Sequence, residues 1–111
     1  MAHVARLLND QGIITLCSFI SPDDNIRRQV EKIIGEERFH LVYMDADVDY
    51  GRENRPKLWE RADRGEIENM PGLDANYDIP ENAQLVIDPQ DDENVERIMT
   101  YLRQEKIFPL K

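Results

Sequence analysis

The pattern of apolar and polar positions is organised around one apolar run that stops abruptly at a Ser-Pro pair. Six of the seven residues from Ile13 to Phe19 are apolar or small, and several are β-branched. This run predicts a strand covered on both faces of a sheet. Ser21 is predicted to cap the following helix, with Pro22 at its first position and acidic residues in its first turn. Such a junction lies at the carboxyl edge of a parallel sheet, where ligands bind, although a well-capped turn without a ligand gives the same pattern.

Helical and strand periodicities alternate along the rest of the chain. Apolar residues at helical spacing predict three helices: residues 2–10, residues 26–34 closed by Gly35, and a last helix that begins at Asp91 or Asp92 and closes before Pro109. Two further strands are predicted at Phe39–Met44 and Leu85–Ile87. The order strand, helix, strand implies a right-handed parallel crossover, so the predicted class is α/β.

The segment from Asp47 to Gly65 is basic within an acidic chain. It holds five of the 14 basic residues: Arg52, Arg55, Lys57, Arg61 and Arg64. The cluster predicts either an anion-binding segment or a helix whose ion pairs, to Glu53, Glu60 and Asp63, contribute about a few tenths of a kcal/mol each. Trp59 is expected to anchor the segment by packing. Residues 69–80 are predicted to form a long irregular loop, which is typical of a functional lid or of disorder.

Composition narrows the classes of function. The 111 residues fit one domain. They include neither a long apolar stretch nor the layout of a signal peptide at the start, so we expect a cytoplasmic protein with no membrane partner. The formal net charge of −9 argues against a nucleic-acid partner. The single cysteine, Cys17, is expected to be a small core residue.

Residues that carry metal or phosphate chemistry are few. His3 and His40 are far apart and have no neighbouring ligands at metal spacing, so neither a zinc site nor a catalytic triad is predicted. Asp45 and Asp47 follow a strand and either hold magnesium or, as we expect, cap the next helix, which leaves no predicted metal ligand. The glycines complete neither a G-x-x-x-x-G-K-S/T phosphate loop nor a G-x-G-x-x-G fingerprint.

Several motifs, taken together, resemble the adenylylsulfate kinases. They are the run from Ala5 to Pro22 with its Phe-Ile-Ser-Pro end, residues 39–45, Leu58-Trp59 with Ala62, Gly65-Glu66-Ile67, Gly72-Leu73-Asp74 with Tyr77, Pro80-Glu81, and Ile107-Phe108-Pro109. The resemblance spans nearly the whole chain. It implies sulfate activation, in which the γ-phosphoryl group of ATP, with Mg²⁺ as cofactor, is transferred to the 3′-hydroxyl of adenosine 5′-phosphosulfate.

The resemblance also implies a fold, the three-layer parallel sheet of the P-loop nucleoside-triphosphate kinases with strand order 2-3-1-4-5. Members of the family carry a phosphate-loop strand and a second strand ahead of the helix with which this chain opens. Residues 1–111 are therefore expected to form one partial domain with an incomplete sheet and a lid at about residues 47–80. The phosphate-loop strand lies between the third and fourth strands. Either the two edges left behind close on one another, a partner chain that supplies this half inserts between them, or copies of this chain pair as a homodimer.

The matching positions imply residues of the adenosine 5′-phosphosulfate pocket. Ile20 and Ser21 are expected to line it, and Ser21 is the candidate catalytic residue, as a phosphoryl carrier. Asn69 and Met70 are expected in the pocket wall, where Met70 replaces an aromatic residue that usually stacks on the substrate adenine. Lys57 is the remaining candidate for substrate binding.

The residues implied in nucleotide binding are fewer. The family's lid arginine and lysine are displaced in this sequence, so Arg52 and Arg55 are expected to substitute for them from neighbouring positions. Asp88 begins the loop that matches the place where the adenine of ATP rests.

Two functions are expected from this combination. The first is an adenylylsulfate kinase domain that is inactive alone, because losing an arginine finger already lowers phosphoryl transfer by about 10³ to 10⁵ and this chain lacks the whole phosphate loop. The alternative is a non-catalytic binding or assembly module, derived from this kinase, that acts through a partner.

Overall fold

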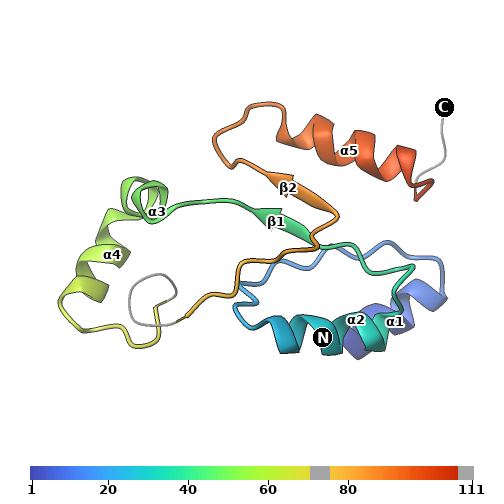
Figure 1. The fold of residues 1–111 in the computed structure, drawn as a ribbon, viewed down its shortest axis with the longest axis horizontal. Helices are drawn as coiled ribbons and strands as arrows, with labels where there is room; N and C mark the ends of the chain where they lie inside the picture. Colours follow the sequence, from blue (N-terminus) through green and yellow to red (C-terminus); the bar gives the residue numbers. More distant parts are fainter. Residues whose placement is uncertain (71–75, 108–111) are drawn as a thin grey trace.

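A computed structural model describes residues 1–70 and 76–107 of the chain. The described residues form α1 (Ala2–Asp10), α2 (Asp24–Ile34), β1 (Val42–Met44), α3 (Val48–Asn54), α4 (Pro56–Asp63), β2 (Leu85–Ile87) and α5 (Asn94–Gln104). α1 packs on α2, α5 lies beside the two strands, and the α3–α4 hairpin projects at the opposite end from α1 and α2 (Figure 1). The molecule is elongated, with extents of 48 × 31 × 23 Å.

The two strands pair in parallel, which confirms the α/β class. Val42 lies opposite Leu85 and Met44 opposite Ile87. The strand predicted at Leu85–Ile87 is confirmed at both ends, whereas the strand predicted from Phe39 begins only at Val42. Between the strands lies an α-helical connection of the kind that parallel pairing requires. The incomplete sheet agrees with the family fold.

The helix after the Ser-Pro pair begins two residues later than predicted. Its N-cap is Asp23, whose carboxylate accepts hydrogen bonds from the backbone N–H groups of Asn25 and Ile26. Ser21 instead has a left-handed backbone with φ of +45°. The predicted cap at Ser21 is therefore wrong, because the aspartate satisfies the free N–H groups of the first turn. The predicted end is confirmed, since Gly35 follows Ile34 with φ of +106°.

The apolar run at residues 13–19 is not a strand. Its side chains face outward, and Leu16 is 86% exposed. The predicted buried strand is wrong, and with it the expectation that Cys17 is a core residue, since Cys17 is exposed. A strand needs a neighbour for its N–H and C=O groups, and none of the strands in the described ranges pairs with this run.

The last helix, α5, begins at Asn94 rather than at Asp91 or Asp92. The carboxylates of Asp88 and Asp91 accept hydrogen bonds from the N–H groups two residues further on, so both form tight turns ahead of the helix. The helix then packs on β2. No helix in the described part of the chain has the length and apolar character that crossing a membrane requires.

Candidate functional site

A buried arginine on α2 joins two segments that are far apart in the sequence. Arg27 is only 5% exposed. Its Nη1 donates to the carbonyl oxygen of Ser21 and its Nη2 donates to the carbonyl oxygen of Asp78, each at 2.5 Å. Ser21 is the third residue of the Phe-Ile-Ser-Pro motif, and Asp78 directly follows Tyr77, the last residue of the motif Gly-x-Asp-x-x-Tyr. We call this arrangement the Arg27 clamp.

Further hydrogen bonds hold the same two segments together. The backbone N–H of Asp78 donates to the carbonyl of Pro22 at 2.8 Å. The backbone N–H of Asp24 donates to Oδ2 of Asp78 at 3.0 Å, while the carboxylate of Asp24 lies 3.5 Å from Nη2 of Arg27. The N-terminal turn of α2 is thereby fixed against the chain at Asp78.

Two tyrosines continue the clamp toward the sheet. The guanidinium of Arg27 lies 5.8 Å from the centre of the Tyr77 ring, and that ring stacks on Tyr43 of β1 with centroids 6.3 Å apart. Burial raises the pKa of Tyr43, and the neighbouring charge of Asp45 raises it further. The site therefore extends from the helix N-terminus to the carboxyl end of β1, the edge where parallel sheets bind ligands.

The two acidic residues considered for magnesium have structural partners. Asp47 caps α3 by accepting the N–H of Tyr50 at 2.7 Å, as predicted for a helix cap. Asp45 follows β1 and lies close enough to Tyr43 for its charge to raise the pKa of that side chain. Among the described residues no group of three or more histidines, cysteines, aspartates and glutamates is placed to hold a metal ion.

The predicted lid segment is a helical hairpin, α3–α4, around a buried tryptophan. Trp59 is 7% exposed and packs directly against Gly51, so its predicted role as an anchor is confirmed. Arg52 lies over the Trp59 ring, 4.8 Å from its centre, and donates two hydrogen bonds to Asp63 at 2.6 and 3.1 Å. Hydrogen bonding raises the pKa of Arg52 and lowers the pKa of Asp63. One of the predicted ion pairs therefore forms, and it occupies Arg52.

Arg55 and Lys57, the other two cationic residues predicted to bind nucleotide or substrate, are exposed. Arg55 joins α3 to α4, and Lys57 lies in the first turn of α4. The hairpin thus brings both to its turn, where an anionic ligand can reach them. Arg52 lies on the same hairpin, with its guanidinium over the Trp59 ring and its side chain 39% exposed.

The remaining predicted residues fall into three places. Ile20 is 64% exposed and precedes the clamped Ser21. Asn69 has a left-handed backbone with φ of +56° and, with the half-buried Met70, lies at the end of the first described range. Asp88 follows β2 and forms the turn before α5. The structure brings Ile20 and Ser21 together, whereas Gly72-Leu73-Asp74 and Phe108-Pro109 of the resemblance lie outside the described residues.

Sequence reasoning missed Arg27, although the spacing held a signal for it. Residue 27 lies three positions before Val30 and seven before Ile34, which belong to the apolar face of α2. A charged residue on the buried face of an amphipathic helix requires partners, since a desolvated charge is otherwise costly. That position therefore marked Arg27 as a paired, buried cation.

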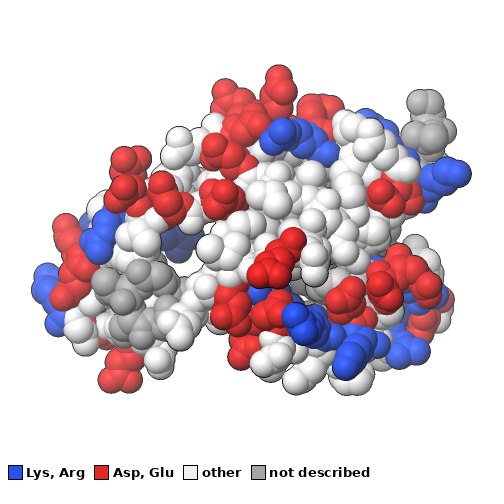
Figure 2. Space-filling model, in the orientation of Figure 1, with Lys and Arg blue, Asp and Glu red and all other residues white. Residues whose placement is uncertain are grey.

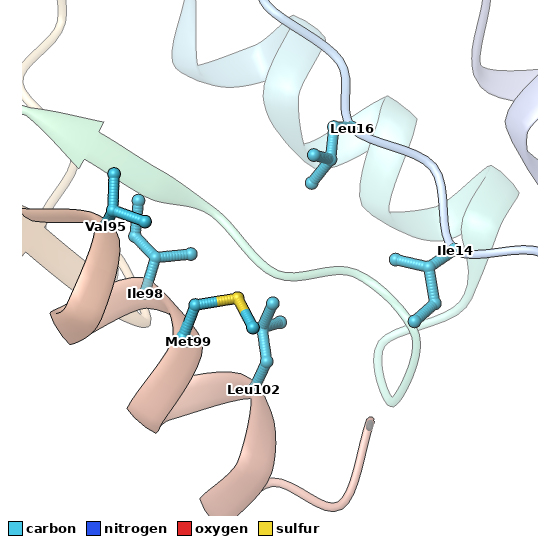
Figure 3. A pocket seen from close by; sticks show the side chains of 6 residues that line it. All are labelled: Ile14, Leu16, Val95, Ile98, Met99 and Leu102. Atoms are coloured by element: carbon cyan, nitrogen blue, oxygen red, sulfur yellow. The ribbon is translucent and has the colours of Figure 1, made fainter. Parts of the chain in front are cut away.

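An apolar hollow lies between the run at residues 13–19 and α5. It has a volume of about 400 Å³ and is lined by Ile14, Leu16, Val95, Ile98, Met99 and Leu102 (Figure 3). The first two residues belong to the run that was predicted as a strand, and the others come from one face of α5. The hollow is therefore an apolar surface, formed by the run and α5, that no neighbouring segment of the described residues covers.

Comparisons with known proteins agree on one family. The model of the adenylylsulphate kinase family matches residues 1–88. An adenylyl-sulfate kinase of Staphylococcus carnosus is 38% identical over 112 aligned residues, covering 97% of this chain and 56% of that protein. A bifunctional enzyme CysN/CysC of Rhodopirellula baltica is 42% identical over 87 residues, which are 78% of this chain and 13% of the larger protein.

A solved structure gives the same result in three dimensions. The crystal structure of APE1195 superposes with a TM-score of 0.74 at 38% sequence identity, covering 95% of this chain and 60% of the solved one. The chain spans about half the length of the curated single-function relatives that it matches, such as the 56% covered in the protein of Staphylococcus carnosus. The matched motifs, the fold and the identity together show that this chain belongs to the adenylylsulphate kinase family.

Proposed function

We propose that this chain carries the adenosine 5′-phosphosulfate pocket of a sulfate-activating kinase and that the 111 residues alone do not transfer the phosphoryl group. Relatives named adenylyl-sulfate kinase support the substrate class. The sequence contains no phosphate loop. Without those backbone N–H groups and the accompanying lysine, the charge of the transferring phosphoryl group has no stabilising cradle.

The Arg27 clamp is the observation that carries this proposal. The two motifs that are most specific in the sequence are Phe-Ile-Ser-Pro and Gly-x-Asp-x-x-Tyr, which are about fifty residues apart. The clamp nevertheless joins them, through Ser21 in the first motif and Asp78, the residue directly after the second. Two separate segments that meet at a helix N-terminus and at the carboxyl edge of a strand form a common type of ligand site. Ile20 and Ser21 then line the pocket, beside the stacked tyrosines.

The lid contributes charge to this proposal. Arg55 and Lys57 are exposed at the turn of the α3–α4 hairpin. Two cations there attract the negative phosphate and sulfate groups of a nucleotide. Arg52 positions the hairpin through Asp63 and Trp59 rather than contacting ligand. Asn69 and Met70, which follow the hairpin, complete the pocket wall, with Met70 as a soft apolar contact for the adenine.

ATP and Mg²⁺ require residues that this chain does not supply. Asp47 caps α3 through the N–H of Tyr50, and no group of three or more metal-ligating side chains lies together in the described residues. Asp88 can border the adenine, since it follows β2 at the carboxyl edge of the sheet. When bound, magnesium and the phosphate loop stabilise the negative charge that is shared among the transferring oxygens. We propose that a segment outside these 111 residues, in a longer product of the same gene or in another chain, carries that half of the reaction.

The apolar surface supports such a partner segment. Figure 2 shows an uncharged area over the sheet and the inner side of α5, bordered by acidic side chains. The hollow of Figure 3 lies between the run at residues 13–19 and α5. An apolar strand that pairs with residues 13–19 would bury Leu16 and cover this hollow. A second copy of this chain is the other occupant that the surface admits.

Calorimetric titration with adenosine 5′-phosphosulfate tests the proposal, with and without ADP and Mg²⁺. We expect binding near the micromolar range, about −8 kcal/mol. Ile20→Asp places a carboxylate at the pocket edge and should weaken binding at least tenfold. Leu7→Asp, the same kind of change at a similarly exposed position on α1 (66% against 64%), should leave the affinity unchanged.

The same preparation tests the second half of the proposal. A coupled assay with ATP, Mg²⁺ and adenosine 5′-phosphosulfate should detect no turnover by the chain alone. Turnover would show that the residues present suffice for phosphoryl transfer. Absence of binding in the titration would contradict the pocket itself and would favour a module that acts through protein contacts.

A further inference from the structure

We propose that Arg27 is the positioning residue of the pocket, which holds the Ser21 turn against the Tyr77–Asp78 segment in the geometry that binds substrate. This inference rests on the proposed function. It adds a residue that makes no substrate contact of its own, because the side chain is buried and its terminal nitrogens donate to two carbonyl oxygens of the chain.

The two segments have little else to hold them in place. Ile20 is exposed on one side and Ile79 on the other, so neither segment is anchored by a buried apolar side chain next to the clamp. Two hydrogen bonds of Asp78, to the carbonyl of Pro22 and to the N–H of Asp24, add to the contacts of Arg27. Without the guanidinium, the carbonyls of Ser21 and Asp78 lose their shared donor, and only the two hydrogen bonds of Asp78 remain between the segments.

The chemistry of the site requires arginine rather than any cation. A guanidinium is planar and offers donors in fixed directions, so one side chain can hold two acceptors at a set separation. Its flat face also lies over the Tyr77 ring, 5.8 Å from the ring centre. The Nε of Arg27 is buried and finds no acceptor within residues 1–70 and 76–107. A lysine would place one compact ammonium group where two directed donors are needed.

The neighbouring arginine provides a matched control. Arg28 is the next residue on α2, and its Nε pairs with the same Asp24 at 2.9 Å. It is 70% exposed, whereas Arg27 is buried. Arg27→Lys and Arg28→Lys therefore make the same chemical change on the same helix. Only Arg27→Lys removes the two hydrogen bonds of the clamp.

The experiment measures adenosine 5′-phosphosulfate affinity by calorimetry and amide hydrogen exchange in the free chain. In Arg27→Lys we expect at least a tenfold loss of affinity and at least tenfold faster exchange of the Asp78 amide, which donates to the carbonyl of Pro22. Exchange further along α2, at Val30 and at the last residue Ile34, should be unchanged, which a merely structural role would not predict. Arg28→Lys should match the wild type in every measurement.

Three results would overturn the inference, and each is distinguishable. Equal affinity of the wild type and Arg27→Lys would remove the positioning role while leaving the proposed pocket in place. Faster exchange throughout α2 in Arg27→Lys would show a general folding role instead of a local one. Failure of the wild type itself to bind would refute the proposed function, and the positioning role would fall with it.

Discussion

Replacing Gly51 with alanine tests whether close packing against Trp59 holds the lid hairpin together. A Cβ atom at residue 51 would lie 2.8 Å from Nε1 of Trp59 and 3.1 Å from its Cζ2, where ordinary contacts begin at 3.4 Å. The ring would have to move by about 0.6 Å. Trp59 is buried and carries Arg52 on its face, so this movement also disturbs the pair between Arg52 and Asp63.

Two opposing effects set the size of the change. Overpacking of a buried contact costs about 1 to 3 kcal/mol. Alanine is favoured over glycine within a helix by about 1 kcal/mol, and Gly51 lies in the middle of α3. We therefore expect Gly51→Ala to lower the free energy of unfolding by about 1 kcal/mol, although helix propensity alone predicts a gain.

A double-mutant cycle separates these effects. In a Trp59→Leu background the clashing ring atoms are gone, so Gly51→Ala should become stabilising by about 1 kcal/mol. Urea unfolding followed by circular dichroism compares all four proteins, because the chain has a single tryptophan and the double mutant has none. In Gly51→Ala alone, the tryptophan emission should shift toward longer wavelengths.

Stabilisation by Gly51→Ala in both backgrounds would refute the reasoning. It would mean that the hairpin opens far enough in solution for the methyl group to fit without moving the ring. The packing of Gly51 on Trp59 would then not be what sets the angle between α3 and α4.

Two other changes test the caps and charges that the structure assigns. Asp23→Ala should destabilise the chain by about 1 kcal/mol in thermal unfolding, because Asp23 caps α2, whereas Ser21→Ala should have little effect; the reverse order would restore Ser21 as the cap. The hydrogen bond from Arg52 lowers the pKa of Asp63 in the folded chain. The ionised Asp63 therefore stabilises the hairpin fully above the ordinary aspartate pKa of about 3.9, and this stabilisation is lost as the pH falls through the lower pKa of the folded chain. The urea midpoint, followed by Trp59 fluorescence, should be higher for the wild type than for Asp63→Asn at pH 7, and the two should converge below about pH 4; a constant difference at all pH values would exclude the ionised pair as its source.

Local signals were sufficient to predict that α1, α2 and α5 exist, whereas the two helices α3 and α4 of the basic segment were foreseen only as one of two alternatives, a single helix. The apolar spacing of α2 and the glycine at residue 35 determine where that helix lies and ends, and both were read correctly. β2 was predicted residue for residue because it is a short β-branched run between turn residues. The start of α2 was wrong because Ser21, Asp23 and Asp24 are all good cap residues, and the choice among them depends on a contact with Arg27 and Asp78 from elsewhere in the chain.

The site could be predicted only in part for the same reason. Motif positions pointed to Ile20 and Ser21, which the structure places beside the clamp. The role of Arg52 was not accessible from spacing, since its partners, Asp63 and Trp59, are set by how α3 folds back on α4. Side-chain partners across a hairpin follow from tertiary packing, which a one-dimensional pattern does not encode.

The wrong prediction at residues 13–19 carries information about the chain. The run has the composition of a central strand, but composition alone cannot supply the hydrogen-bonding neighbours that a strand needs. Leu16 is exposed next to the apolar face of α5, and a solvated run of this kind is unfavourable while both faces remain uncovered. The sequence of the run is therefore adapted to a larger sheet than the two strands of the described residues, in which the run is one strand and a further segment pairs with it. A segment that completes that sheet would bury Leu16 and bring the phosphate-binding chemistry that the clamp and lid lack.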